Sequence, residues 1–161
     1  MLKVSIIMNC YNGEKYLHEA LSSIISQTYQ NWELIFFDNK STDQSKTIFE
    51  SFKEPRFFYY LAEEHTKLFK ARNKAMMKTK GDLIAFLDVD DYWSEIKLER
   101  QCDKFQEDDN LDFVFCKYSV VDEFFDSVKT KQKDDLSFKT QEELIMINQK
   151  LLLAIIKLRY L

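Results

Sequence analysis

One stretch of this chain, LIAFLDVDDYW from Leu83 to Trp93, limits the possible folds more than any other. Its first five residues are mostly apolar, which is typical of a strand buried on both faces inside a parallel sheet. Three carboxylates, Asp88, Asp90 and Asp91, follow where that strand would end. In open α/β sheets, ligands bind outside the carboxyl ends of the strands. The stretch therefore predicts a ligand site at the edge of a parallel sheet.

Close carboxylates repel one another unless a positive group neutralises them. A divalent cation that also holds a phosphate would do so, because Mg²⁺ and Mn²⁺ prefer oxygen ligands. The alternative is that the three acids are solvated loop residues that cap the next helix. At this point both interpretations stay open.

Strand-like and helix-like segments alternate over the first two-thirds of the chain. Apolar runs predict strands at Lys3–Met8, Glu33–Phe37, Arg56–Leu61, Leu83–Leu87 and Leu111–Ser119. Apolar residues at helical spacing predict helices at Glu14–Gln27, Asp43–Phe52, Thr66–Lys80, Ser94–Asp109 and Gln141–Ile147. This alternation predicts an α/β fold with a mostly parallel sheet that is flanked by helices and has right-handed crossovers.

Local signals refine some element ends. Ser41 or Thr42 is predicted to cap the second helix, and Gly81 to end the third. The charged stretch Asp122–Lys139 predicts a loop or an irregular hairpin. The apolar tail Leu151–Leu161 predicts a core strand or helix, because a helix on a membrane surface needs a broad polar face.

Length and composition set further bounds. A chain of 161 residues fits one domain, and a net charge of −4 argues against a generic nucleic-acid binder. The three cysteines, Cys10, Cys102 and Cys116, form no CxxC pair, so they indicate neither a zinc site nor a disulfide framework. No signal peptide or membrane-spanning run is recognisable. We therefore expect a cytoplasmic protein with reduced cysteines.

Polar side chains follow three of the predicted strands. They are Asn9, Tyr11 and Asn12 after the first, Asp38 and Asn39 after the second, and Asp88, Asp90 and Asp91 after the fourth. Arg72 and Asn73 lie on the helix that precedes the fourth strand. Neither GxGxxG nor GxxxxGK[ST] is present, so a bound phosphate would need a metal and an arginine instead of a glycine-rich loop. Because the carboxyl ends of parallel strands converge on one edge of a sheet, we expect these groups to meet there, and the pattern predicts a nucleotide-diphosphate site.

Two other uses of the aspartates can be compared with the sequence. A calcium loop of the EF-hand type that begins at Asp88 requires glycine at its sixth position, where Trp93 stands. A haloacid-dehalogenase-like phosphatase also places two aspartates, as at Asp88 and Asp90, after an apolar strand. Its motif normally follows the first strand and continues to Thr or Val, where this chain has Tyr92. The phosphatase remains as a distant alternative.

Three segments carry a resemblance to a known family. They are VSIIMNCYNGEKYLHEALSSIISQTYQNWELIFFDNKSTDQS, KARNKAM and GDLIAFLDVDD. In this order and spacing they resemble the N-terminal part of a family 2, GT-A-type inverting glycosyltransferase, the kind that builds bacterial surface polysaccharides. The resemblance covers roughly the first 120 residues and implies that the predicted α/β sheet is a Rossmann-like nucleotide-binding sheet of the GT-A type.

The resemblance implies where a sugar nucleotide would bind. Cys10, Tyr11 and Asn12 would line the base pocket, and Asp38 would contact the donor base. The family commonly has Pro-Val-Tyr-Asn where this chain has NCYN, and Asp-Asp-Gly-Ser-Thr-Asp where it has DNKSTD. Both departures keep the Tyr-Asn pair and the first aspartate, so the implied donor site is retained.

The resemblance also implies a metal site. Arg72 would lie close to the nucleotide, and Asp88 on its ribose or phosphate side. Asp90, together with Asp88, would bind Mn²⁺ or Mg²⁺, which would act as a Lewis acid on the leaving diphosphate. The donor would be a UDP- or GDP-linked sugar and the acceptor a glycan or glycolipid.

Inverting transfer also needs a carboxylate that deprotonates the acceptor hydroxyl. The acids of the last third, Asp122, Asp134 and Asp135, do not match the family motif that supplies it. We therefore expect residues 1–161 to form a single, incomplete GT-A domain, with donor binding in 1–120 and the start of the acceptor part in 121–161.

Three interpretations follow for the whole chain. It could be the truncated donor-binding half of a transferase, a minimal transferase that obtains its base from a partner, or a non-catalytic nucleotide-sugar-binding module. An incomplete sheet would also expose apolar residues near Leu151–Ile156 and favour self-association. Peripheral contact with the inner membrane face remains a further expectation.

Overall fold

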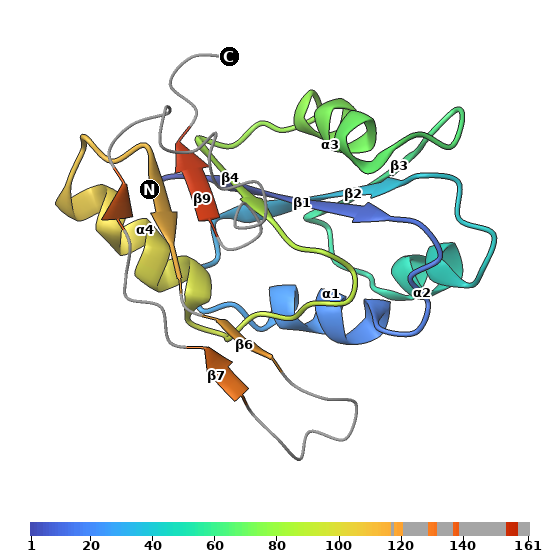
Figure 1. The fold of residues 1–161 in the computed structure, drawn as a ribbon, viewed down its shortest axis with the longest axis horizontal. Coiled ribbons are helices and arrows are strands. Elements are labelled where there is room, and N and C mark those ends of the chain that lie inside the picture. Colours follow the sequence, from blue (N-terminus) through green and yellow to red (C-terminus); the bar gives the residue numbers. More distant parts are fainter. Residues whose placement is uncertain (117, 121–128, 132–136, 139–153, 158–161) are drawn as a thin grey trace.

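The structure is a computed structural model that describes residues 1–116, 118–120, 129–131, 137–138 and 154–157. Its main sheet has the strand order β3-β2-β1-β4-β9-β5-β8, and β6 pairs with β7 in a second sheet (Figure 1). The strands are β1 (Val4–Cys10), β2 (Trp32–Asp38), β3 (Phe57–Leu61), β4 (Leu83–Phe86), β5 (Phe113–Phe115), β6 (Tyr118–Val120), β7 (Lys129–Lys131), β8 (Ser137–Phe138) and β9 (Ala154–Lys157). The helices are α1 (Leu17–Ile25), α2 (Ser45–Ser51), α3 (Leu68–Met76) and α4 (Lys97–Glu107).

The first four strands are parallel to one another. In their register, Cys10 lies opposite Asp38 and Ile7 lies opposite Phe86, so the carboxyl ends of β1, β2 and β4 meet at one edge. Strand β9 is antiparallel to both β4 and β5. The predicted mostly parallel α/β sheet is therefore confirmed.

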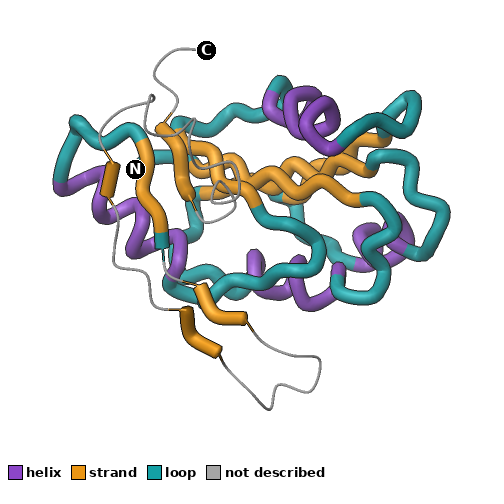
Figure 2. Tube along the Cα trace, viewed as in Figure 1, coloured by secondary structure: helices purple, strands orange, loops and turns teal. Residues whose placement is uncertain are grey.

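Helices cover both faces of the sheet (Figures 1 and 2). Alternate residues of β1 enter two different cores: Met8 packs with residues such as Leu21 of α1, whereas Ile7 packs with Ala71 and Ala75 of α3. All seven residues of β1 are buried. This explains why the strand reads as a continuous apolar run instead of an alternating one.

Gly81 does not end a helix, contrary to the prediction. Helix α3 stops at Met76, and Gly81 instead crosses β1 at very short range. A Cβ at Gly81 would lie 2.6 Å from the backbone oxygen of Lys3 and 2.7 Å from the backbone nitrogen of Ser5. Only a residue without a side chain fits this approach.

The predicted cap of α2 is also wrong. The helix begins at Ser45, whose backbone N–H donates to Asp43 Oδ1 over 3.0 Å. Ser41 is used elsewhere, because its hydroxyl accepts the backbone N–H of Asn12 at 3.1 Å. Asp43 Oδ2 accepts the backbone N–H of Glu14 at 2.9 Å. These polar side chains fasten the loop after β2 to the loop after β1.

The tail contributes strand β9 to the main sheet, which confirms the core strand that was one of the two structures predicted for Leu151–Leu161. Ile155 of β9 is fully buried, and β9 pairs with β4 on one side and β5 on the other. The predicted helix 141–147 lies outside the described residues. In the described part of the chain, no helix combines the length and apolar character that crossing a membrane requires.

Glu33 is a buried charge at the amino-terminal end of the sheet. Its side chain is fixed by Lys3 Nζ at 2.5 Å, Ser5 Oγ at 2.7 Å and the backbone N–H of Lys80 at 2.8 Å. Burial alone would raise the pKa of Glu33, but the hydrogen bonds from Lys3, Ser5 and Lys80 outweigh it and hold the pKa below its ordinary value.

We expect this carboxylate to make the fold sensitive to acid. A group with a lowered pKa in the folded state stabilises the protein above its unfolded pKa, and that stabilisation is lost as the pH falls through the folded pKa. The free energy of unfolding should therefore decline below the ordinary pKa of 4.5. Urea melts at a series of pH values should show a flatter decline for Glu33→Gln than for the wild type. Glu50→Gln, at an exposed position, should keep the wild-type slope; equal slopes for all three proteins would contradict this assignment.

Candidate functional site

The loops that follow β1, β2 and β4 touch one another at the carboxyl edge of the sheet. The backbone N–H of Asn39 donates to the carbonyl oxygen of Cys10 at 2.8 Å. A Cβ at Gly13 would lie 3.0 Å from Val89 Cγ2 and 3.1 Å from Cys10 Sγ. The predicted meeting of the strand ends is therefore confirmed, with Val89 of the Asp-Val-Asp sequence packed against the first loop.

The strongest charge interaction at this edge joins α3 to the loop after β4. Arg72 Nη2 donates to Asp88 Oδ1 over 2.8 Å, and both side chains are largely buried. Burial raises the pKa of Asp88 and the charge of Asp90 adds to this, although Arg72 opposes both. Loss of hydration and the charges of Asp90 and Asp88 also raise the pKa of Asp91. The edge thus holds more negative charge than Arg72 neutralises.

The carboxylates of Asp88 and Asp90 suit a divalent metal ion only when a bound ligand, such as a diphosphate, supplies further oxygen atoms. Among the described residues, no three His, Cys, Asp or Glu side chains come close enough to hold a metal ion. Mg²⁺, however, is usually bound through one or two carboxylates plus substrate phosphates. Asp90 is exposed, and Asp88 carries a second oxygen that Arg72 does not bind. Two carboxylates of this kind match a site that a diphosphate completes.

Asp38 lies at the end of β2 and is only 1% exposed. Its Oδ1 accepts the backbone N–H of Ser41 at 2.7 Å, and its Oδ2 accepts the hydroxyl of Tyr59 at 2.6 Å. One oxygen therefore holds the loop after β2 and the other holds Tyr59 of β3. Asp38 is not among the residues that line the pocket described below.

Asn12 fastens the same loop from the opposite side. Its Oδ1 accepts the backbone N–H of Thr42 at 2.8 Å. Its backbone has a φ of 54°, in the left-handed region that asparagine tolerates better than most residues. The Tyr-Asn pair thus combines an exposed ring at Tyr11 with a residue that shapes the turn.

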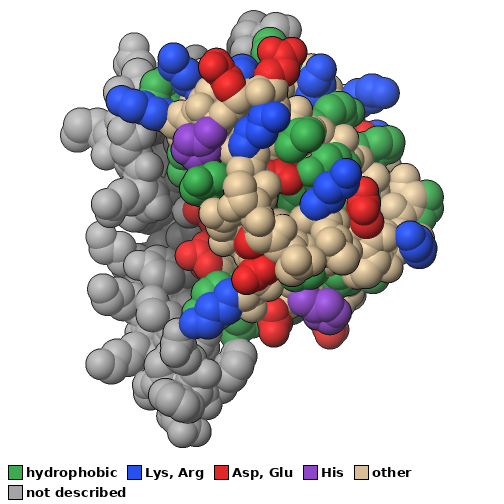
Figure 3. Space-filling view, turned by 90° about the vertical axis from the view of Figure 1, so that its right-hand side faces the viewer, with side chains coloured by type: hydrophobic (Ala, Val, Ile, Leu, Met, Phe, Trp, Pro, Cys, Tyr) green, Lys and Arg blue, Asp and Glu red, His purple; other side chains and the backbone are tan. Residues whose placement is uncertain are grey.

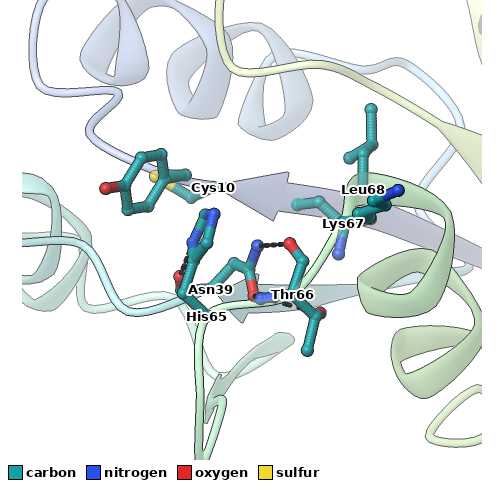
Figure 4. A pocket seen from close by; sticks show the side chains of 8 residues that line it. Cys10, Asn39, His65, Thr66, Lys67 and Leu68 are labelled. Carbon is teal, nitrogen blue, oxygen red and sulfur yellow. Dashed lines mark hydrogen bonds between the residues drawn. The ribbon is translucent and has the colours of Figure 1, made fainter.

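A pocket of about 310 Å³ opens beside these loops (Figure 4). Its walls come from the end of β1, from Asn39 and from the connection between β3 and α3; the lining residues are Asn9, Cys10, Tyr11, Asn39, His65, Thr66, Lys67 and Leu68. Asn39 Nδ2 donates to the Thr66 oxygen at 2.7 Å, and Asn39 Oδ1 accepts the Thr66 N–H at 3.0 Å. The rings of Tyr11 and His65 are 4.2 Å apart. An aromatic wall with polar groups at its base suits a flat, polar ring such as a nucleobase.

The pocket brings together some predicted site residues and adds others. Cys10 and Tyr11 both line the pocket. The Cys10 thiol lies 3.7 Å from Ser41 Oγ, and burial raises the pKa of this thiol. Sequence reasoning missed His65 and Lys67, because this connection carries no motif. Asn9 was predicted to follow the first strand, but it belongs to β1.

Figure 3 looks onto the carboxyl edge of the sheet and shows acidic and basic side chains spread together over it. A ligand at this edge therefore meets charges of both signs.

Comparison with known proteins gives a consistent result. The family described as Glycosyl transferase family 2 matches residues 5–157. A putative teichuronic acid biosynthesis glycosyltransferase of Bacillus subtilis, TuaG, is 34% identical over 120 residues, which are 73% of this chain and 47% of that protein. A second relative is WfgD of Escherichia coli, a UDP-Glc:alpha-D-GlcNAc-diphosphoundecaprenol beta-1,3-glucosyltransferase. It is 36% identical over 118 residues, which are 73% of this chain and 46% of WfgD. The chain thus spans about half the length of these relatives.

A solved structure extends the comparison to three dimensions. The crystal structure of Staphylococcus aureus TarS 1-349 in complex with UDP superposes with a TM-score of 0.71 at 28% identity, over 76% of this chain and 37% of that one. The family match covers most of the described sheet and, apart from Val4, all three segments on which the sequence resemblance rests. The chain therefore belongs to glycosyl transferase family 2 and has the GT-A fold.

Proposed function

We propose that this chain binds a nucleotide-diphosphate sugar at the carboxyl edge of its sheet and is the donor-binding part of an inverting glycosyltransferase. The observation that carries the proposal is the Arg72–Asp88 pair, which joins a guanidinium to one of the three carboxylates at the same sheet edge as the aromatic-walled pocket. A nucleobase fits the pocket, and a diphosphate fits the mixed charges. Residues 1–120 would bind the donor and 121–161 would begin the acceptor part.

Each predicted site residue has a place in this proposal. Tyr11 would stack on the base, and the backbone of Cys10 would close the pocket beside it. Asn12 and Asp38 would hold the two loops in position, with Asp38 acting through the loop that it orders. Asp88 would face the ribose or the phosphates.

Asp90 and Asp88 would bind Mn²⁺ or Mg²⁺ together with the diphosphate. When bound, such an ion supplies Lewis-acid stabilisation of the leaving diphosphate. The residues of this chain would orient the donor around it, because Arg72 holds one Asp88 oxygen and leaves the second one unbonded by its guanidinium.

We further propose a UDP-linked donor and a glycan or glycolipid acceptor in cell-surface polysaccharide synthesis. WfgD is named for UDP-Glc and for a diphosphoundecaprenol-linked acceptor, and TuaG for teichuronic acid biosynthesis. TarS has been solved with UDP and with UDP-GlcNAc, at 28% identity to this chain. The acids Asp122, Asp134 and Asp135 lie outside the described residues, so no general base is assigned.

The replacement Arg72→Leu tests this proposal. It removes the positive charge beside the phosphates and leaves Asp88 largely buried without its partner. A charge-assisted hydrogen bond contributes about 1.5–3 kcal/mol, so the affinity for UDP in the presence of Mn²⁺ should fall about 10- to 100-fold. Lys70→Leu, at an exposed position on the same helix, is the matched control and should bind as the wild type does. Equal affinity for UDP in both variants would contradict the proposal.

A further inference from the structure

Asn9 has a buried amide without a hydrogen-bond partner. The residue is 8% exposed, and neither its Oδ1 nor its Nδ2 is bonded. Within the described residues, the one other buried side-chain atom in this condition is Nε1 of Trp32, at the far end of β2 beneath the guanidinium of Arg56. Burying a polar group without a partner is unfavourable, so an amide that stays in this position calls for an explanation.

The location of Asn9 suggests what its partner is. The residue lines the pocket that also contains Tyr11 and His65. The neighbouring amide of Asn39 is already occupied, because it donates to the Thr66 oxygen and accepts the Thr66 N–H (Figure 4). Asn9 therefore brings to this pocket an unused carbonyl acceptor next to an unused N–H donor.

We propose that the Asn9 amide recognises the edge of the uracil base, which rests on the proposed binding of a UDP-linked donor. Uracil presents an N3–H donor beside a carbonyl acceptor. Asn9 Oδ1 would accept the N3–H, and Asn9 Nδ2 would donate to the adjacent carbonyl oxygen. Paired hydrogen bonds of this kind are how asparagine amides discriminate bases. Asn9 would thus be a base-recognition residue, at a position where the chain departs from the Pro-Val-Tyr-Asn pattern.

Access to the amide requires the pocket wall to move. Both polar atoms of Asn9 lie below the surface, so a base must displace part of the wall to reach them. The connection between β3 and α3 is the exposed part, with His65 and Lys67 both open to solvent. The ring of His65 contacts the ring of Tyr11, and His65 Nδ1 donates one hydrogen bond of 3.0 Å to the backbone oxygen of Asn39. A base that replaces His65 against Tyr11 would gain the stacking contact and uncover Asn9.

The test is Asn9→Leu, which has similar volume and no polar atoms. We expect its affinity for UDP to fall about 10- to 100-fold, as for a lost pair of buried hydrogen bonds. Its thermal midpoint without nucleotide should equal or exceed that of the wild type, because an unsatisfied amide has been removed. The wild type should bind UDP about 10-fold more tightly than N3-methyl-UDP, whereas Asn9→Leu should bind the two equally. Asn31→Leu, at the opposite end of β2, is the matched control.

The outcomes separate this inference from the proposed function. If Asn9→Leu binds UDP as tightly as the wild type, the inference is overturned and UDP binding stands. If the wild type binds none of UDP, CDP and GDP, the proposed function fails and the inference fails with it. If Asn9→Leu does not fold, Asn9→Ser takes its place, and the wild-type comparison of UDP with N3-methyl-UDP still tests the inference. Equal binding of the two nucleotides by the wild type overturns the inference.

Discussion

Asp90→Ala is expected to abolish metal-dependent nucleotide binding while the fold remains intact. Asp90 is exposed and lies two residues after Asp88, so its loss creates no cavity. Its charge raises the pKa of both Asp88 and Asp91, and removing it relieves repulsion among the three acids. Residues that merely support a metal ligand contribute about 10- to 100-fold to metal affinity, so losing a ligand should weaken Mn²⁺-dependent UDP binding by about 100-fold or more.

Calorimetric titration with UDP, in Mn²⁺ and in EDTA, measures this effect. Asp103→Ala removes the same charge from an exposed position on α4 and should leave the metal-dependent affinity unchanged. The thermal midpoint of Asp90→Ala without ligands should match or exceed that of the wild type. Unchanged metal-dependent affinity in Asp90→Ala would remove Asp90 from the site.

Gly81→Val is expected to cause the largest loss of stability of any single change considered. The two atoms nearest an added Cβ are backbone atoms of Lys3 and Ser5 at the start of β1. This strand is paired on both sides within the sheet and cannot retreat. Overpacking a core commonly costs about 1–3 kcal/mol, and a clash with backbone at 2.6 Å should reach or exceed the upper end.

Urea denaturation gives the free energy of unfolding for this comparison. Lys80→Val introduces the same side chain at the preceding, exposed position and should change stability by less than about 0.5 kcal/mol. Equal stability of Gly81→Val and Lys80→Val would contradict the close contact between Gly81, in the connection from α3 to β4, and the start of β1.

The central sheet was predictable because its signal is carried by consecutive residues. Buried parallel strands need apolar side chains on both faces, so β1, β2 and β4 each appear as an uninterrupted run. The polar residues that end these runs then had to meet at one edge, which predicted the proximity of the loops around Cys10, Asn39 and Asp88. The sequence also placed Arg72 on the helix before β4, but the ion pair of Arg72 with Asp88 was not predicted.

The details of the site were not predictable because they depend on contacts between distant residues. Gly81 looked like a helix terminator, and only the crossing with Lys3 reveals its role. Ser41 looked like a helix cap, but Asn12 uses its hydroxyl. The unpartnered amide of Asn9 cannot be read from a sequence at all, because the burial and the hydrogen bonds of a side chain are set by the folded structure.

The central claim is that the carboxyl edge of this sheet binds a nucleoside diphosphate through a metal. The most direct measurement is the thermal midpoint of the wild type with UDP, GDP or CDP, each with and without Mn²⁺. A ligand that binds only the folded state raises the midpoint, and at 100 times its dissociation constant it adds about 2.7 kcal/mol of stability. We expect UDP to raise the midpoint in Mn²⁺, with little effect in EDTA and little effect from the other two nucleotides. No rise with any nucleotide, at concentrations up to several millimolar, would contradict the claim.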